Sequence, residues 1–567
     1  MLKALHTTIQ SFKPEPKRVP HKSIKWTLFS LLIAVLISIP VLTVVVSVFT
    51  PAGEIWAHLA ETVLSDYVKN SLLLITGVSV GVLLIGISSA WLITMCEFPG
   101  RKIFEWASIL PFAIPAYLMA YIYTDFFDIA GPFQSMLRSV FALGIDEYWF
   151  PNIRSVEGAI VIMSLAFYPY VYMLARSSFL EQSTNLLEAS RIMGYSTWES
   201  FLKVALPVAR AGIAAGLALA LMETLNDFGT VEYFGVQTFT TGIYRTWFGL
   251  GERPAAAQLA AFLMAFVVVL VILERWSRNR ISDKQSDSNR FKRLNRFQLK
   301  GIRSTLAFMA CFLPVLAGFI IPVILLLEMF FSNLNHINYK FLELSFNSFT
   351  VSAITGFLAV FIALMMAYAA RLNPTKYVRI FNRISSLGYA IPGSVIAVGV
   401  LIPFGFIDNS IDTFFRETLG FSTGLLLSGT LFAMVFAYLV RFLAVSFGGV
   451  EASMSKITPN MDEAARGLGY PFLRVLRNIH IPMMSGGLLT AGLLVFVDVM
   501  KELPATLIVR PFNFDTLAVQ VYRYASDERL AESAGAALMI VLVGIIPVIL
   551  ISRTIARSRK SETKIDK

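Results

Sequence analysis

Long uncharged apolar runs alternate with short polar segments along most of this chain, and most of these runs could cross a membrane as a helix. The fifth run of each set is the weakest, because acidic residues follow it early. The pattern predicts an all-α polytopic membrane protein with about 12 transmembrane helices. The runs form two sets of six, at 26–49, 71–96, 106–124, 158–175, 213–222 with an extension, and 255–273, then at 305–327, 349–370, 384–406, 425–440, 486–497 with an extension, and 534–551.

The two sets are copies of one unit. The string Glu188-Ala-Ser-Arg-Ile-Met-Gly-Tyr returns 275 positions later as Glu463-Ala-Ala-Arg-Gly-Leu-Gly-Tyr. Six spans per copy give both copies the same orientation, which indicates a parallel repeat about an axis along the membrane normal. Further matches, at an offset of 277, pair Asn70-Ser71 with Asn347-Ser348 and Ala113-Ile114-Pro115 with Ala390-Ile391-Pro392.

The polar segments divide the chain into five parts. A basic linker joins two six-span halves, so the stoichiometry of the halves is fixed at one to one. The expected parts are a cytoplasmic tail at 1–25, a first half at 26–273, the linker at 274–304, a second half at 305–552 and a cytoplasmic tail at 553–567.

The basic residues determine the expected orientation. The chain is 56% hydrophobic with a mean hydropathy of +0.67 and a formal charge of +11. Alternate loops, including both tails and both copies of the repeated string, hold 37 of the 48 lysines and arginines. This asymmetry predicts that both termini are cytoplasmic, and it assigns the basic charge to topology and contact with the lipid bilayer rather than to nucleic acid.

Metal and disulfide chemistry find little support in the sequence. The two cysteines, Cys96 and Cys311, lie in apolar runs without a ligand spacing, and the five histidines are scattered. We therefore expect no metal site from these residues.

The repeated strings read as helix–turn–helix segments outside the apolar spans. Gly194 and Gly469 fall where the chain must reverse, because glycine adopts positive φ without steric cost. Pro207 and Pro482 follow at matching positions, and we expect Pro207 to block continuation of the helix into the next span. The turns before Pro207 carry an apolar face, which suggests that the segment docks against a partner.

These strings resemble the Glu-Ala-Ala signature of the membrane subunits of bacterial ATP-driven importers that use a substrate-binding protein. The resemblance implies the type I ABC importer permease fold, with each loop acting as a coupling helix in a groove of an ATPase subunit. Ser190 replaces the second alanine, a mild departure from the signature. The residues that carry the expected coupling role are Glu188, Ala189, Ser190, Gly194 and Pro207 in the first loop and Glu463, Ala464, Ala465, Gly469 and Pro482 in the second.

The chain itself lacks a phosphate-binding loop of the form Gly-x4-Gly-Lys-Ser/Thr. We therefore expect that it is not an enzyme, that it binds no cofactor, and that ATP and Mg are bound by partner ATPase subunits, two per complex. The resemblance also implies an extracytoplasmic substrate-binding protein and a place in the bacterial inner membrane.

Four acidic residues end the two fifth spans and also pair across the repeat at an offset of 275. Glu223 matches Asp498, and Asp227 matches Glu502. A carboxylate near a span is costly unless it faces water, a partner or a pathway. One interpretation is an external helix end with a local salt bridge from Asp498 and Glu502 to Lys501. The other is a gate or lining for a transported cation.

Three strings narrow the resemblance to fused permeases of ferric-iron importers: Lys501-Glu-Leu-Pro-Ala-Thr506, Arg510-Pro-Phe-Asn-Phe-Asp-Thr-Leu-Ala518 and Tyr522-Arg-Tyr-Ala-Ser-Asp527. Thiamine and molybdate permeases are similar over the first string, so these substrates stay open. An ion-coupled carrier or channel and a membrane enzyme acting on lipid are the alternative classes. The duplicated loop and the lack of a clustered catalytic set argue against both.

Overall fold

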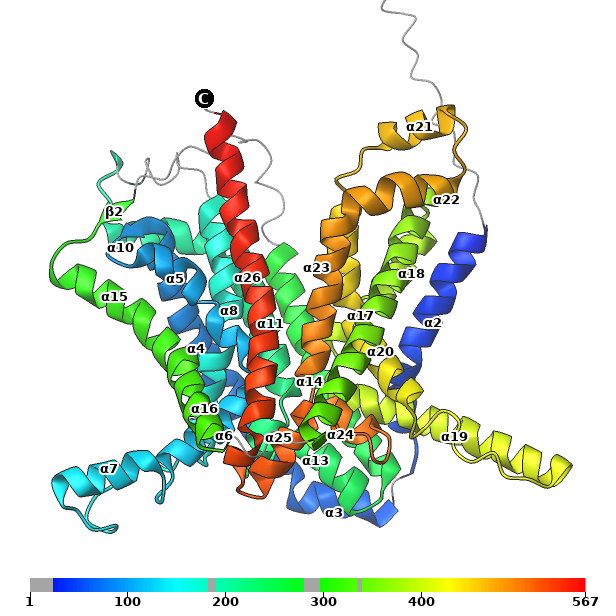
Figure 1. Ribbon diagram of the computed structural model, residues 1–567, viewed down its shortest axis with the longest axis horizontal. Coiled ribbons are helices and arrows are strands. Elements are labelled where there is room, and N and C mark those ends of the chain that lie inside the picture. Colours follow the sequence, from blue (N-terminus) through cyan, green and yellow to red (C-terminus); the bar gives the residue numbers. More distant parts are fainter. Residues whose placement is uncertain are drawn as a thin grey trace, which may run out of the picture.

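The computed structural model describes residues 24–51, 53–181, 190, 192–279, 296–333 and 339–565, and its regular structure is almost entirely helical (Figure 1). Within these residues the strands are β1 (Cys96–Glu97) and β2 (Phe297–Gln298), which pair in parallel. Eleven of the described helices are long and apolar enough to span a membrane. A bent pair, Arg101–Ala113 and Ala116–Phe141, is a twelfth candidate. The predicted all-α polytopic class is confirmed.

The first half begins with α2, which contacts α14 of the same half near its end. The described elements before the linker are α2 (Ile24–Ser47), α3 (Gly53–Thr62), α4 (Leu64–Met95), β1, α5 (Arg101–Ala107), η1 (Leu110–Ala113), α6 (Ala116–Phe127), α7 (Pro132–Phe141), α8 (Val156–Glu181), α10 (Thr197–Ser200), η2 (Phe201–Ala205), α11 (Leu206–Asn226), α12 (Gly229–Tyr233), α13 (Phe239–Tyr244), η3 (Arg245–Gly249) and α14 (Arg253–Asn279).

The second half repeats this order. After β2 come α15 (Ile302–Val315), η4 (Leu316–Ile320), α16 (Ile321–Ser332), α17 (Tyr339–Leu372), α18 (Lys376–Ser385), η6 (Gly388–Ala390), α19 (Gly393–Leu419), α20 (Leu431–Met454), α21 (Pro459–Gly467), α22 (Phe472–Val475), η7 (Leu476–His480), α23 (Ile481–Met500), α24 (Pro504–Val509), α25 (Leu517–Ser526), η8 (Leu530–Ser533) and α26 (Ala534–Ile565).

The third span of each half is broken, although the sequence predicted continuous helices at 106–124 and 384–406. In the first half the two pieces meet at 89°. Pro115 directly precedes α6, and Pro392 directly precedes α19. A proline lacks the backbone N–H that an α-helix needs and disfavours helical geometry in the residue before it. The prolines therefore start new helices instead of lying inside one.

The first span of each half packs against the other half. Helix α2 contacts α18 and α19, and its Ile37 belongs to the same buried cluster as Val400 of α19. Helix α15 contacts α4 and α5, and its Cys311 is buried among residues of the first half. The two halves of the sequence are therefore interlocked in space.

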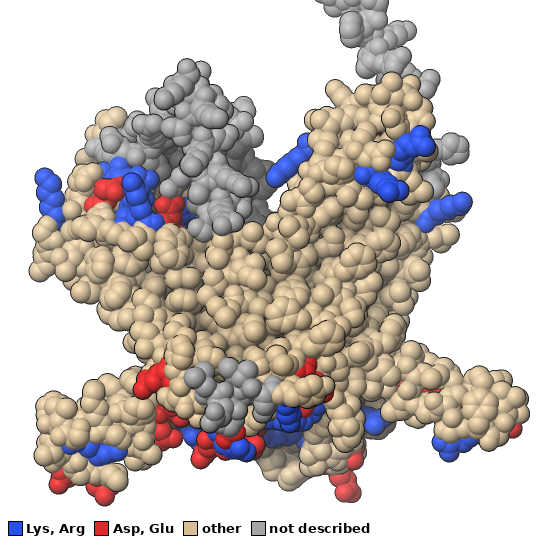
Figure 2. Space-filling model, in the orientation of Figure 1, with Lys and Arg blue, Asp and Glu red and all other residues tan. Residues whose placement is uncertain are grey.

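The segments that the charge pattern assigned to one side of the membrane do lie together at one end of the molecule. Helices α5, α10, α18 and α21 share this end with the described start of α2 and the C-terminus (Figure 1). The helices diverge toward this end in two lobes, one ending in α10 and the other in α21. A belt without charged residues separates the charged side chains of the two ends (Figure 2).

Candidate coupling loops and central pocket

The turns of the two repeated loops have the same geometry. Gly194 and Gly469 both have φ of 81°, and a Cβ added to either would meet no atom within 4 Å. After each turn a backbone N–H closes back onto the preceding helix, from Tyr195 to Ser190 O at 3.0 Å and from Tyr470 to Ala465 O at 3.1 Å. The expected reversal at both glycines is confirmed.

The structure describes some of the remaining signature residues, and these differ in exposure to solvent. Glu188 and Ala189 lie outside the described residues. Ser190 and Ala465 are buried, whereas Glu463 and Ala464 are exposed. The exposed pair is available to a partner.

The expectation that Pro207 ends the preceding helix is wrong, and Pro482 does not end its helix either. Helices α10, η2 and α11 follow one another without a break, and so do α22, η7 and α23. In each copy a π-helical turn lies directly before the residue that precedes the proline. The wider turn changes the hydrogen-bonding pattern where the proline lacks an N–H, so the helix continues into the span.

Large apolar side chains are exposed on both loops. Trp198 is 65% exposed and Ile192 is 87% exposed in the first loop, and Leu468 and Leu473 are 78% and 74% exposed in the second. Phe201, three residues after Trp198 in the same apolar stretch, is instead buried. An exposed apolar patch of this kind marks a surface for a protein partner.

The first loop rests on aromatic rings, here called the aromatic seat (Trp91, Phe179, Phe201 and Phe297). The ring of Phe201 lies 4.9 Å from that of Trp91, which also contacts Phe179 at 5.6 Å and Phe297 at 6.4 Å. Phe297 belongs to β2, so the linker contributes to this seat. The hydroxyls of Ser190 and Ser200 are hydrogen-bonded at 2.9 Å beside it.

The second loop rests on an ionic seat (Tyr368, Arg371, Asp462 and His480). Arg371 Nε donates to Asp462 Oδ2 at 2.7 Å, and His480 Nε2 lies 2.7 Å from Asp462 Oδ1. The guanidinium also donates to three backbone carbonyls that precede α21, those of residues 454, 457 and 458. Tyr368 Oη donates to Phe472 O at 2.7 Å.

Two acids of the loops have lowered pKa values. Partial burial opposes ionisation of Asp462, but the hydrogen bonds from Arg371 and His480 outweigh it and lower its pKa. In the first loop, hydrogen bonds from the backbone and hydroxyl of Ser196, together with Lys203, lower the pKa of Glu199 to about 2. Both acids are therefore ionised at neutral pH.

A central pocket, partly open to solvent, lies between the two halves. It is located at the ends of α11 and α23 that are farthest from the repeated loops. All four acids predicted to line a path border it: Glu223, Asp227, Asp498 and Glu502. Tyr117, Tyr170 and Tyr389 add phenol groups to its wall.

The pocket is built from repeat-related positions. At the offset of 275, the lining pairs include Glu223 with Asp498 and Asp227 with Glu502. The halves differ at two other pairs, where the second half carries the positive charge. Asn226 is matched by Lys501, and Ala166 is matched by Arg441.

Asp227 and Glu502 have structural duties inside the pocket wall. Asp227 accepts hydrogen bonds from the backbone N–H groups of Thr230 and Val231, at 2.9 and 3.3 Å, and so caps α12. Glu502 accepts from the N–H of Ala505 at 3.0 Å at the start of α24. Both acids are more than nine-tenths buried.

Asp498 and Glu223 are the more accessible acids. Their side chains are 17% and 20% exposed. Asp498 Oδ1 lies 3.2 Å from Lys501 Nζ, which confirms the local ion pair that the sequence suggested for this acid. Glu502, for which an ion pair with Lys501 was also expected, is instead paired with Arg441. Because Asp498 and Glu223 also line the pocket, a local ion pair and a place on the pocket wall are compatible.

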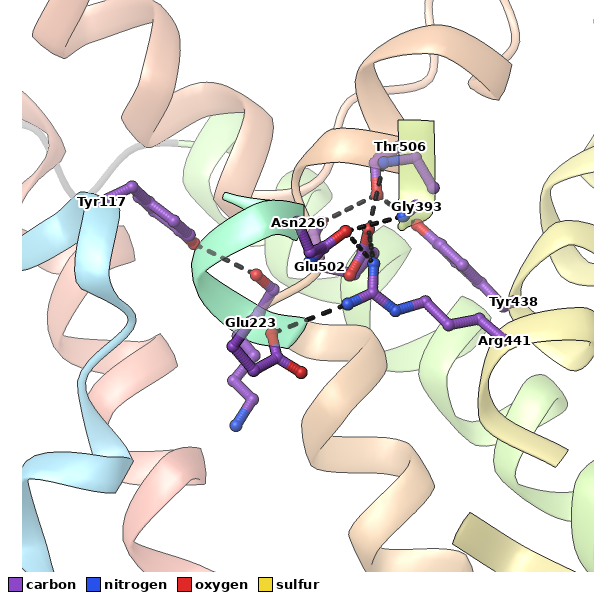
Figure 3. A network of polar contacts seen from close by, with 10 residues as sticks. Tyr117, Glu223, Asn226, Gly393, Tyr438, Arg441, Glu502 and Thr506 are labelled. Carbon is purple, nitrogen blue, oxygen red and sulfur yellow. Dashed lines mark hydrogen bonds and ion pairs between the residues drawn. The ribbon is translucent and has the colours of Figure 1, made fainter. Parts of the chain in front are cut away.

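Arg441 is the central residue that the sequence reasoning missed. Its Nη1 donates to Asn226 Oδ1 at 2.9 Å and to Glu502 Oε1 at 3.0 Å, and its Nη2 lies 3.7 Å from Glu223 Oε2 (Figure 3). The predicted fourth span ended at residue 440, which placed Arg441 just outside the membrane. Helix α20 continues to Met454, so this arginine lies inside the helix and is buried. The apolar residues that follow it were the available signal.

None of the described residues forms a group of three or more histidines, cysteines, aspartates or glutamates that could hold a metal ion. The pocket acids are instead engaged with helix N-termini, Arg441 and Lys501. In this arrangement the pocket offers no preformed coordination shell.

Comparison with known proteins agrees with this architecture. The family model of the binding-protein-dependent transport system inner membrane component matches residues 82–283. The chain is 26% identical over 502 residues to the Fe(3+)-transport system permease protein FbpB 2 of Haemophilus influenzae, a match that covers 86% of this chain and 90% of that protein.

Two other relatives show how the halves correspond. The probable ABC transporter permease protein y4fN of Sinorhizobium fredii is 23% identical over 524 residues, covering 87% of this chain and 88% of that protein. The molybdenum transport system permease protein ModB of Escherichia coli is 24% identical over 197 residues, covering 34% of this chain but 83% of its own length. One half of this chain is thus comparable in size to ModB.

The chain is a two-half, multi-pass permease subunit of the binding-protein-dependent ABC importer class, and residues 82–283 carry the family's domain. This class resides in the inner membrane and works with an ATPase and a substrate-binding protein.

Proposed function

We propose that this chain forms the complete translocation pathway for ferric iron in an ATP-driven importer. The main observation in favour of ferric iron as the substrate is the similarity to a ferric-iron permease across both halves. The pocket supports it chemically, because carboxylate and phenol oxygens are suitable ligands for a hard cation. Several of the carboxylate oxygens are already hydrogen-bonded or ion-paired within the protein, so they should bind the ion weakly. Weak binding suits a permease, since a pathway must release its ion.

The two loops are the proposed coupling points. Each loop receives one ATPase subunit, giving two per complex, and the exposed apolar side chains of α10 and α22 supply the docking contacts. ATP and Mg are bound by these partners, while this chain catalyses no reaction and binds no cofactor. The loops and both termini face the cytoplasm, so the diverging lobes represent the inward-facing state.

The substrate-binding protein is expected to dock at the opposite end, near the pocket. A molybdate or sulfate importer is the second candidate, because Lys501 and Arg441 place positive charge in the pocket and permeases of both kinds are among the relatives. Their ion pairs with the pocket acids make an oxyanion the less favoured substrate. Thiamine remains a third alternative.

Substrate identity can be tested with the permease and its ATPase reconstituted in proteoliposomes. Binding protein loaded with ferric iron should stimulate ATP hydrolysis and deliver iron to the lumen, whereas binding proteins loaded with molybdate, sulfate or thiamine should not. Stimulation by one of these other ligands, without stimulation by the iron-loaded protein, would refute the iron assignment.

The pocket acids can be tested in the same system. Glu223→Gln and Asp498→Asn remove charge without removing a helix cap, so each should slow iron uptake while insertion and ATPase binding stay normal. Asp227→Asn and Glu502→Gln should also reduce the thermal stability of the complex, because these residues cap α12 and α24. Wild-type uptake by both Glu223→Gln and Asp498→Asn would exclude these two acids from the pathway.

A further inference from the structure

Arg441 connects elements of both halves at a single point. Through Asn226 and Glu223 it holds the end of α11 in the first half, and through Glu502 it holds the end of α23 in the second. Asn226 Oδ1 also accepts the backbone N–H of Gly393, at the start of α19, at 2.6 Å. One amide and one guanidinium thereby join three helix ends (Figure 3).

The packing around this junction is close. A Cβ at position 393 would lie 2.5 Å from Arg441 Nη1 and 2.6 Å from Glu502 Oε1. Only glycine lets the start of α19 approach the ion pair this closely. Gly229 is similarly tight, because a Cβ there would lie 2.5 Å from Tyr117 Cβ and 2.9 Å from Leu503 of the other half. The two halves are thus pressed together beside the pocket.

The junction is asymmetric, although the pocket around it follows the repeat. The position that corresponds to Arg441 in the first half is Ala166, so the chain carries one such guanidinium and not two. A buried arginine is stable only while its charge is compensated. Separating α11 from α23 would remove Glu223 and Asn226 from Arg441, and this loss opposes separation.

We propose that Arg441 is the latch of the pathway on the side of the pocket away from the coupling loops. It is a positioning residue: it holds α11, α19 and α23 together, and it neutralises Glu223 and Glu502 until the pathway opens. Opening toward the binding protein breaks the contacts across the halves and frees Glu223 for the arriving cation. This inference rests on the proposed function of an ATP-driven importer.

The test measures ATP hydrolysis by the complete permease–ATPase complex in proteoliposomes, without binding protein. Arg441→Gln weakens the latch, so the basal rate should rise about tenfold, the effect expected from losing a charge-assisted hydrogen bond. Arg441→Lys keeps the charge but not the branched donor geometry, and it should give a smaller rise. Asn226→Ala removes the uncharged acceptor and should also raise the basal rate.

Arg176→Gln is the matched control. Arg176 is also buried in a span and paired with a carboxylate, that of Glu105, but it does not line the pocket. Its basal rate should stay at the wild-type value. A general loss of packing would raise the basal rate of this control as well, and that result would overturn the latch.

A second readout follows access to the pocket. Ala166→Cys places a thiol in the pocket wall, while the native Cys96 and Cys311 are buried elsewhere. A membrane-impermeant thiol reagent is then added on the binding-protein side. It should label the cysteine of the double variant Ala166→Cys, Asn226→Ala faster than the cysteine of Ala166→Cys alone. Unchanged labelling would overturn the latch.

The outcomes separate the two proposals. If the wild-type complex responds to iron-loaded binding protein but neither Arg441→Gln nor Asn226→Ala raises the basal rate, the latch is refuted and the proposed function stands. If the wild-type complex never responds to a loaded binding protein, the proposed function is refuted, independently of the latch. Should Arg441→Gln not assemble, Asn226→Ala decides, and a basal rate at or below wild type refutes the latch.

Discussion

The first loop rests on tilted and edge-on aromatic rings, whereas the second rests on an arginine–aspartate–histidine cluster. Both seats also receive a ring from the segment that enters the other half's first span. Phe297 contacts Trp91 in the first seat, and Trp26 contacts Tyr368 at 5.9 Å in the second. Trp91 and Tyr368 are themselves repeat-related, at the offset of 277.

The difference between the seats shows what the duplication had to preserve. The turn has the same φ in both copies, and the proposed docking of each loop to an ATPase subunit accounts for this. The seat only has to hold the loop in place, and apolar packing or an ion pair can do this. Apolar contact is non-directional, while the ionic seat fixes its groups by hydrogen-bond geometry, so the two loops should fail in different ways.

The largest expected effect is that of Trp91→Ala. Removing a buried tryptophan costs about 3–5 kcal/mol, and here the cost falls on the aromatic seat. The first loop should become sensitive to protease and transport should drop sharply, while the protein still inserts. Tyr368→Ala is the matched change, and it should disturb the second loop less because the Arg371–Asp462 pair remains. Equal protease sensitivity of the two loops would contradict the distinction between the seats.

Arg371→Met should release the second loop and leave the first unchanged. Taking away one member of a largely buried pair costs about 3 kcal/mol, and three carbonyls also lose a donor. Adding Asp462→Asn should restore part of the protection, which limited proteolysis can measure. An unaltered second loop in Arg371→Met would contradict the ionic seat.

The same seat predicts a pH dependence for the second loop. The pKa of Asp462 is lower in the folded state, so the pair contributes its full stability above the unfolded value of about 3.9 and loses it as the pH falls through the folded pKa. Protease protection should therefore be flat from neutral pH to about pH 4. A transition of the second loop near pH 6 that Asp462→Asn abolishes would be inconsistent with the lowered pKa.

Gly194→Val and Gly469→Val should have equal effects, in contrast to the seat variants. A residue with a Cβ pays about 1–2 kcal/mol in the left-handed region, and both positions have the same φ and open surroundings. Transport per inserted molecule should fall by a similar factor for each. A defect confined to one copy would show that the two turns are used differently.

The smallest effect is expected when two buried residues of the first loop are replaced by the residues at the matching positions of the second loop. Ser190→Ala alone should cost about 1 kcal/mol through its hydrogen bond with Ser200. The double variant Ser190→Ala, Ser200→Val reproduces Ala465 and Val475, which are both buried, and should recover most of this loss. Thermal unfolding of the complex can compare the three proteins, and a double variant less stable than the single one would argue against exchangeable contacts.

The sequence alone determined the class of protein and the layout of its repeat. Apolar run length predicts spanning helices because the bilayer requires it, and the duplicated string located both helix–turn–helix loops. Gly194 and Gly469 could be assigned to turns because their role is local. The correspondence of Glu223 with Asp498 between the two copies could likewise be seen from the repeat offset.

Other features depended on contacts between distant parts of the chain. Sequence pattern placed Arg441 at a loop boundary, because a charge normally ends an apolar run. Only the meeting of α11, α19, α20 and α23 supplies the partners that allow this guanidinium to be buried. The helix caps made by Asp227 and Glu502 depended on where the short helices α12 and α24 begin.

The exchange of first spans between halves was decided by tertiary structure for the same reason. Helices α2 and α15 are apolar over most of their length, and such helices can pack against either half with similar local energetics. The choice depends on the shape of the surface that each helix meets, since buried side chains are stabilised by close packing with specific neighbours. Periodicity in the sequence contains no record of those neighbours, and the folded chain brings them together.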